Sequence, residues 1–440
     1  MASRLPLRQV VDTISHDVHP PIWYVLTHLW EQIGGMRPLW LKSFPLLLSL
    51  ANIAVTYRLA RRTLGTSAAL LAAALITLNH AHLRFSQEAQ SFALEWLLVM
   101  LVVNTGWDWL ETRRVRSAVG YLMFGALSMY THYISLAILF TFGAWGVVRL
   151  RREGAACARW IGFHALLALA FLPQLPIEIR QFVQDDAWHR GHFAAPGDWL
   201  TLGRVIAFEK TYLIPVMILL ALLPFLDPAR RRIATLLWSL AVFPIFAVRL
   251  WALNFPREIV YVVPLFTPLV AAGVVRLPGT WIRRVVAVLL LIAAARPDTG
   301  RTDFPEPSML MRAKQQLDRL ARPGDVIVHS ETHSLLFFRL YDPARDHRML
   351  WPPERQVPYY EGGLIVPPAW CIAPATWDSL RASDARWWAI ALNRAQIVPG
   401  HGFTRTGLSL DSLARSTPGV RELADPPVLL WGSASTARKP

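Results

Sequence analysis

Ionisable side chains gather in four segments of the sequence, each beside an apolar run. The segments are HDVHPPIWY (16–24), RFSQEAQSFAL (84–94), MYTHYISL (129–136) and FPREIVYVVP (255–264). Polar groups at membrane depth are costly, and this makes them functional candidates. Arginine binds phosphate well, and a carboxylate nearby can act as a base or hold a divalent cation against the phosphate. Together these residue types suit group transfer from a lipid-phosphate donor.

Each candidate also has a structural interpretation. Asp17 fits the N-cap of the helix expected after it, and Glu88 fits a surface acid. His132 could form a hydrogen bond between helices. Arg257 could anchor its helix at the membrane interface. The sequence has no HExxH or similarly dense metal-ligand spacing, so no cofactor is firmly expected. A divalent cation is the one candidate, and Glu88 is its one candidate ligand.

The composition indicates a membrane protein. Of 440 residues, 54% are hydrophobic and 17% are charged, whereas soluble domains have about 25% charged residues. Disorder, collagen and a disulfide-stapled module are excluded, because the chain is too apolar and has only two cysteines. The net charge of +15 does not indicate nucleic-acid binding, because the basic residues lie in short loops between apolar runs.

Ten apolar runs follow residue 40, and a spanning helix needs about 20 such residues. The runs cover residues 41–60, 67–84, 91–107, 118–130, 132–149, 160–176, 211–227, 233–250, 258–276 and 281–296. The stretch 117–150 is too long for one span, so we divide it near Thr131, His132 and Tyr133.

The arginines set the expected orientation. They cluster after alternate runs, at 58–62, 113–116, 149–152, 230–232 and 276–284. Cytoplasmic loops carry this excess of positive charge, so all four polar segments and residues 297–440 are expected outside the cytoplasm. Residues 1–40 must also lie outside, yet no span or signal-peptide pattern precedes them. Either the protein begins upstream of Met1 with a further spanning helix, which we favour, or the first forty residues cross the membrane unaided.

Three domains are expected. Residues 1–40 form an outer-loop remnant with an interfacial helix at 20–34, residues 41–296 form the membrane domain, and residues 297–440 form an α/β domain. In the last, 326–328 and 387–392 are strand candidates, while 335–340 suits either a helix or a strand. The fold class is a polytopic α-helical membrane protein with about ten spans and a C-terminal extracytoplasmic α/β domain.

In order and spacing, the four polar segments resemble those of bacterial membrane glycosyltransferases of the GT-C fold. The group most similar is the family 39-like enzymes, which are related to protein mannosyltransferases and lipid A aminoarabinose transferases. The resemblance covers essentially the whole chain, including RPGDVIVHS at 322–330. It implies a location in the bacterial inner membrane and a polyprenyl-phosphate sugar donor. It also implies an acceptor that is a lipid, glycan or protein.

The resemblance also implies roles for single residues. Glu88 matches an acid near the donor phosphate or a cation, His19 a polar position beside the donor, and Arg257 a basic position near the phosphate. Two features depart from the family. The usual acidic pair of the first outer loop is absent, which leaves Asp17 as the candidate base, and Gln90 stands where SQEAR is usual.

The leading hypothesis is a glycosyltransferase acting at the outer face of the membrane. The candidate site residues are Asp17 and Glu88 as catalytic acids, and His19, Arg84, Gln87, His132, Arg257 and Tyr261 as donor or phosphate ligands. One alternative is a lipid or glycan transporter, which should show internal repeats and midplane charges. The other is an inactive GT-C-like accessory protein, an alternative raised by the missing acidic pair.

Overall fold

The structure is a computed structural model. It describes residues 6–15, 20–181, 203–208, 210–250, 260–295, 307–329, 332–351, 366–382, 386–392, 421–422 and 428–432. The chain forms two compact units that divide between residues 298 and 299. The first unit is helical and the second is an α/β domain.

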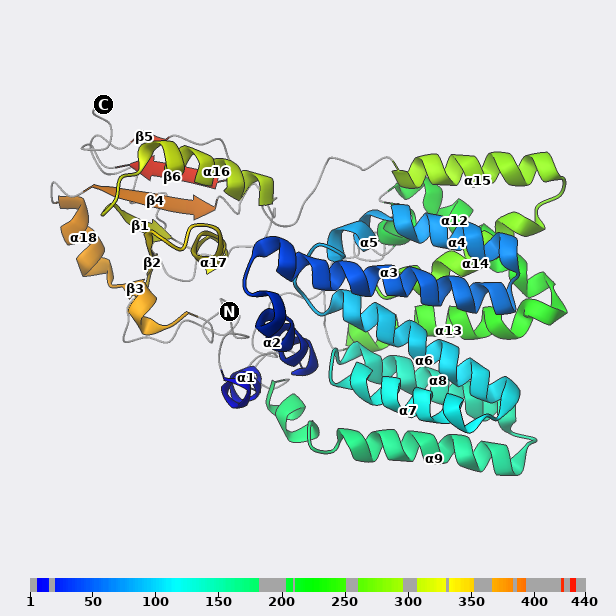
Figure 1. The fold of residues 1–440 in the computed structure, drawn as a ribbon. Helices are drawn as coiled ribbons and strands as arrows, with labels where there is room; N and C mark the ends of the chain where they lie inside the picture. The colour runs from blue at the N-terminus through cyan, green and yellow to red at the C-terminus, as the bar shows by residue number, and fades with distance from the viewer. Residues whose placement is uncertain are drawn as a thin grey trace. The chain divides into compact units, whose positions relative to one another are not determined.

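The helical unit contains all ten apolar runs, and every run contains helix (Figure 1). Its elements are α1 (Leu7–Ile14), α2 (Ile22–Gly34), α3 (Pro38–Thr63), α4 (Thr66–Leu78), α5 (His80–Phe85), α6 (Phe92–Thr112), α7 (Val115–Met129), α8 (Ile134–Leu150), α9 (Gly154–Phe171), η2 (Thr211–Leu213), α12 (Ile214–Leu222), η3 (Leu223–Leu226), α13 (Pro228–Leu250), α14 (Val262–Arg276) and α15 (Thr280–Ala295). The break between α7 and α8 confirms the division expected near Thr131.

The outer surface of this unit is strongly apolar. Phe140 of α8 is 78% exposed and Leu169 of α9 is 60% exposed, and such surfaces suit hydrocarbon better than water. By length and composition, α3 and α9 are the two helices of the described chain that could cross a membrane. Shorter apolar helices include α4, α7, α8 and α14. The count of about ten spans stays a prediction.

Two helices form the centre of the helical unit. Helix α6 packs against α3 and α7, and α14 packs against α4, α12 and α13. Every residue of α14 from Val262 to Val274 is buried. The approach between α12 and α14 is very close, because a Cβ at Gly273 would lie 1.9 Å from the Leu220 carbonyl oxygen. Helix α14 is therefore held in place on all sides.

The second unit is built on a mixed six-stranded sheet with strand order β3-β2-β1-β4-β6-β5. Its elements are α16 (Pro307–Leu320), β1 (Val326–His329), α17 (Thr332–Tyr341), β2 (Asp346–Leu350), η6 (Pro368–Trp370), β3 (Cys371–Ile372), α18 (Pro374–Ala382), β4 (Trp387–Leu392), β5 (Arg421–Glu422) and β6 (Val428–Gly432). Strands β1 to β4 pair in parallel, and β6 pairs antiparallel with β4 and β5. The strands expected at 326–328 and 387–392 are present, and the ambiguous stretch 335–340 is helix α17.

Helices cover both faces of the sheet (Figure 1). On one face, Leu317 of α16 and Phe338 of α17 pack with Ile327 and Trp388. On the other face, Trp377 of α18 packs with strand residues of β1, β2 and β4. The central strands are therefore buried on both sides, as is usual for parallel sheets.

Asp325 anchors the turn between α16 and β1. Its carboxylate accepts hydrogen bonds from the Arg322 backbone N–H (2.9 Å), Trp388 Nε1 (2.8 Å) and Arg386 Nε (3.0 Å). Burial opposes ionisation of Asp325, but these hydrogen bonds and the charge of Arg386 hold its pKa below the ordinary value. The RPGD turn (322–325) connects α16 to β1, and Asp325 also ties it to β4 through Trp388.

Candidate functional site

The described parts of the four polar segments, residues 20–24, 84–94, 129–136 and 260–264, come together at one end of the helical unit. The Ile22 N–H, at the start of α2, donates to the Tyr130 carbonyl oxygen (3.0 Å) after α7. The Phe92 ring, at the start of α6, lies 5.9 Å from the His132 ring. The fourth segment joins through Tyr261, which precedes α14 and interacts electrostatically with Glu95 of α6. Residues distant in the sequence therefore form one local site.

A buried acid lies at the centre of this site. Glu95 occupies the first turn of α6 and is 1% exposed. Its Oε1 lies 3.9 Å from Nδ1 of His132, which is also buried. The Tyr261 side chain is fully buried, and its hydroxyl has no hydrogen-bond partner among the described residues. Glu95, His132 and Tyr261 together form the Glu95 cluster.

The local helix geometry suits an acid at this position. A helix N-terminus carries a partial positive charge, which stabilises a carboxylate in the first turn. The surrounding wall is aromatic. The His82 ring of α5 stacks on Trp96 at 5.4 Å, and Phe85 packs edge-on against Trp96. Because Glu95, His132 and Tyr261 are themselves buried, charges in the Glu95 cluster act on one another more strongly than they would in solvent.

Helix α5 is held by a side-chain cap. The Asn79 Oδ1 accepts from the His82 backbone N–H (3.1 Å), and its Nδ2 donates to the Val205 carbonyl oxygen (3.2 Å). The Nε2 of His82 has no hydrogen-bond partner in the part of the chain that is described. The cap thus fixes the position of an imidazole whose Nε2 could meet a ligand.

Glu88 and Arg84 form an ion pair near the start of α6. Arg84 Nε lies 2.9 Å from Glu88 Oε1, and the two side chains are about 30% exposed (29% and 31%). Gln87 is exposed, and its Nε2 donates to the Leu83 carbonyl oxygen (3.2 Å). Within the described ranges, no group of three His, Cys, Asp or Glu side chains could hold a metal ion. At this pair, a phosphate would compete with Glu88 for Arg84.

The structure brings some of the expected site residues together. Arg84 pairs with Glu88, and His132 and Tyr261 meet around Glu95. Asp17, His19 and Arg257 lie outside the described residues. The sequence reasoning missed Glu95, although a signal was present. Glu95 is the one charged residue of the apolar run 91–107, and a lone acid inside a membrane helix is a functional candidate.

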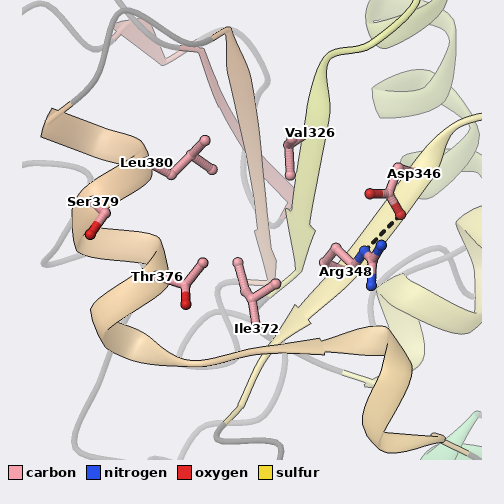
Figure 2. Close-up of a pocket in the computed structure, with 7 residues that line it drawn as sticks. All are labelled: Val326, Asp346, Arg348, Ile372, Thr376, Ser379 and Leu380. Atoms are coloured by element: carbon pink, nitrogen blue, oxygen red, sulfur yellow. Dashed lines mark hydrogen bonds and ion pairs between the residues drawn. The ribbon is translucent and has the colours of Figure 1, made fainter.

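The α/β unit has a hollow of its own, on the side of the sheet covered by α18 (Figure 2). Its volume is about 550 Å³. Apolar side chains such as Ile372 and Leu380 line most of it, and Thr376 contributes a hydroxyl. An ion pair between Asp346 and Arg348 (2.7 Å) closes one side. The charge of Arg348 is thus already balanced by Asp346. For this reason the hollow is a weaker candidate for the functional site than the Glu95 cluster.

Comparisons with known proteins identify the fold. No protein-family profile and no curated protein sequence matches this chain. Two solved structures of ArnT from Cupriavidus metallidurans do match, one in the apo state and one bound to undecaprenyl phosphate. Their TM-scores are 0.60 and 0.58, and each is 14% identical to this chain. Each match covers 97% of this chain, and 89% and 90% of the respective ArnT chains.

At 14% identity the similarity establishes the fold. ArnT is a lipid A aminoarabinose transferase of the GT-C fold. The similarity extends over both units of this chain, because only 3% of its length lies outside the match. The chain therefore has the GT-C membrane fold of ArnT, as the resemblance carried by its four polar segments implies.

Proposed function

We propose that the protein is an integral-membrane glycosyltransferase that moves a sugar from a polyprenyl-phosphate donor to a lipid, glycan or protein acceptor. The reaction takes place at the outer face of the cytoplasmic membrane. The observation that carries this proposal is the buried Glu95 cluster, which lies beside the described parts of the four polar segments. The fold supports it, because an ArnT structure that matches 97% of the chain has undecaprenyl phosphate bound.

The proposed chemistry is a displacement at the anomeric carbon. The acceptor hydroxyl loses its proton to a carboxylate, and its oxygen forms the new bond to the sugar. The bond between the anomeric carbon and the phosphate oxygen breaks, and polyprenyl phosphate leaves as an anion. Asp17 is the proposed base, and Glu88 lies near the phosphate or a cation. The donor ligands of this proposal are His19, Arg84, Gln87, His132, Arg257 and Tyr261.

The ion pair of Arg84 and Glu88 provides the first test. In Glu88→Gln, transfer from a polyprenyl-phosphate sugar is expected to fall about 100-fold or more, a typical effect of losing a catalytic carboxylate. Stability should change little, because partly exposed ion pairs contribute only about 0–1 kcal/mol. The measurement is the transfer rate of purified protein, with the thermal midpoint recorded alongside.

The matched control is Glu153→Gln. Glu153 is also an ion-paired acid, held by Arg113 (which follows α6) and by Arg149. It lies near the opposite end of α6, so its loss should leave transfer unchanged. Full transfer in Glu88→Gln, at normal expression, would contradict the assigned role. Wild-type protein without transfer would indicate an accessory protein, and flux across liposomes without covalent change would indicate a transporter.

A further inference from the structure

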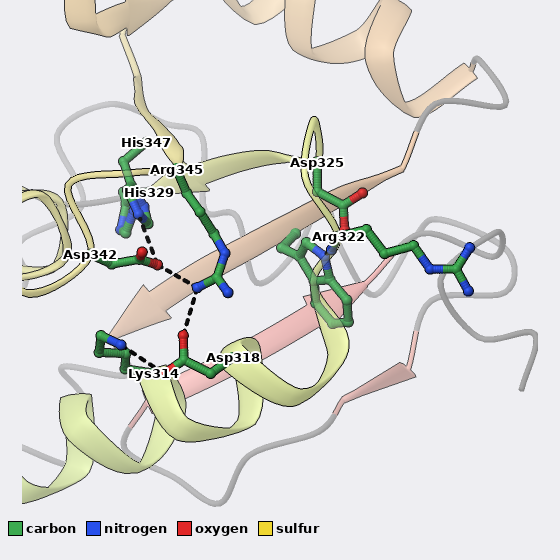
Figure 3. A network of polar contacts seen from close by, with 9 residues as sticks. Lys314, Asp318, Arg322, Asp325, His329, Asp342, Arg345 and His347 are labelled. Carbon is green, nitrogen blue, oxygen red and sulfur yellow. Dashed lines mark hydrogen bonds and ion pairs between the residues drawn. The ribbon is translucent and has the colours of Figure 1, made fainter. Parts of the chain in front are cut away.

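The α/β unit contains a buried pair of histidines on adjacent strands (Figure 3). His329 lies on β1 and His347 on β2, and both are 0% exposed. The Nε2 of His329 lies 3.0 Å from the Nδ1 of His347. Both rings also contact Phe338 of α17, with ring centroids 5.3 and 5.4 Å away. The pair is therefore enclosed between the sheet and a helix.

Polar groups extend this pair at both ends. At one end, Ser334 Oγ of α17 lies 3.0 Å from His329 Nδ1. At the other end, His347 Nε2 lies 3.4 Å from Oδ2 of Asp342, which follows α17. Ser334, His329, His347 and Asp342 form a four-residue series that we name the histidine chain. It joins α17, β1 and β2 inside the domain.

A cationic network surrounds the carboxylate end of the histidine chain. Arg345 Nη1 contacts Asp342 at 2.6 Å and Asp318 of α16 at 2.7 Å. Lys314 Nζ contacts Asp318 at 2.6 Å.

Arg339 of α17 faces the histidines as well, since its Nη2 donates to the His347 carbonyl oxygen (2.6 Å). The charge of Asp342 is thus already balanced, and Arg339 adds a positive charge close by.

With one ring proton on each histidine, every contact of the histidine chain can pair a donor with an acceptor. If His347 Nε2–H donates toward Asp342, His347 Nδ1 accepts from His329 Nε2–H. His329 Nδ1 then accepts from the Ser334 hydroxyl. A second proton on His347, at Nδ1, requires His329 to move its own proton to Nδ1 and donate it to Ser334, and it leaves a cation on a fully buried ring. A second proton on His329 would reverse the Ser334 hydroxyl and leave a buried cation beside Arg339.

We propose that the histidine chain is a proton-controlled latch, which is closed while both imidazoles are neutral and is opened by one further proton. Opening separates α17 from β1 and β2. In the orientation proposed above, the latch would respond to the pH outside the cytoplasm. The proposal concerns the fold of the α/β unit, so it can be tested without any transfer activity.

The pH range of opening follows from the ionisation of the two rings. Burial lowers the pKa of His347 to about 4 and lowers that of His329 well below its ordinary value of 6.5. A group whose folded pKa is depressed contributes stability above its unfolded pKa and loses it as the pH falls. The latch is therefore fully closed above pH 6.5 and weakens between pH 6.5 and about 4.

Hydrogen exchange of the full-length protein tests the latch. Protection is compared at pH 7.5 and pH 5.0, after correction for intrinsic exchange rates, in peptides that cover β1, α17 and β2. The proton on His347 alone should lower protection about 30-fold across this range. The protection of peptides from α6 and α14 should change much less between the two pH values. Equal protection at both pH values in wild-type protein would overturn the proposal.

Variants distinguish opening of the latch from a general loss of protection at low pH. In His347→Gln, protection should be lower at pH 7.5 but should show no 30-fold fall by pH 5.0. In Ser334→Ala, which keeps both imidazoles, the pH dependence of protection should persist. If His347→Gln does not fold, Ser334→Ala provides the test in its place. His80→Gln, in the helical unit, is the control and should behave as wild type. A wild-type pH response in His347→Gln would overturn the latch.

Discussion

Glu95→Gln is expected to lower sugar transfer about 100-fold or more while the protein still folds. The amide keeps the size of the side chain but replaces the carboxylate whose Oε1 lies 3.9 Å from His132 Nδ1 with a group that cannot ionise. Loss of a group that places or moves protons typically costs about 10²–10⁴ in rate. The measurement is the transfer rate of purified protein with a polyprenyl-phosphate sugar, at matched concentration and with the thermal midpoint recorded.

Glu95 acts in this proposal through its neighbours, so it is a positioning residue. Three readouts distinguish that role from a merely structural one. The loss should fall on kcat more than on KM, the pH–rate profile should shift, and Glu95→Asp should recover part of the rate. The control is Glu111→Gln, which changes an exposed acid of the same helix and should have no effect. Full activity in Glu95→Gln would reduce the Glu95 cluster to a packing feature.

The positions of the helices were predictable because their signal is local. Each apolar run is long enough to be read without knowledge of its neighbours, and His132 with its flanking residues marks the break between α7 and α8. The ends of helices were less predictable. Helix α9 begins at Gly154, six residues before the apolar run at 160–176, because Arg159 separates the small residues of its first turn from that run. The run 67–84 divides at Asn79, whose side chain caps α5.

The candidate site was predictable only in part. The alternation of arginine-rich loops predicts that the four polar segments share one side of the membrane, and this orientation stays a prediction. The structure adds that the described parts of these segments lie near one another. The ion pair of Arg84 and Glu88 was not predicted from the sequence, because α5 ends at Phe85 and Glu88 lies in the turn that follows it. Glu95 was hidden inside an apolar run. The pairing of His329 with His347 was not predictable, because it depends on the register between β1 and β2.

Gly273→Ala is expected to destabilise the helical unit strongly. The new Cβ would lie 1.9 Å from the Leu220 carbonyl oxygen and 2.6 Å from its carbonyl carbon. These are backbone atoms, so no side-chain rotation relieves the clash and α12 must move away from α14. Overpacking of this kind costs about 1–3 kcal/mol, and sometimes more. The thermal midpoint of the detergent-solubilised protein should therefore fall by several degrees, with a lower folded yield.

The matched control is Gly162→Ala in α9, where a Cβ would meet nothing within 4 Å. Alanine in an unobstructed helix position should be neutral or stabilising by up to about 1 kcal/mol. The comparison also links fold to site, because Tyr261 directly precedes α14. A shift of α14 should move Tyr261 away from Glu95, so Gly273→Ala should lose transfer even at temperatures where it remains folded. Normal transfer by folded Gly273→Ala would show that the site tolerates movement of α14 and that Tyr261 is not needed where the structure places it.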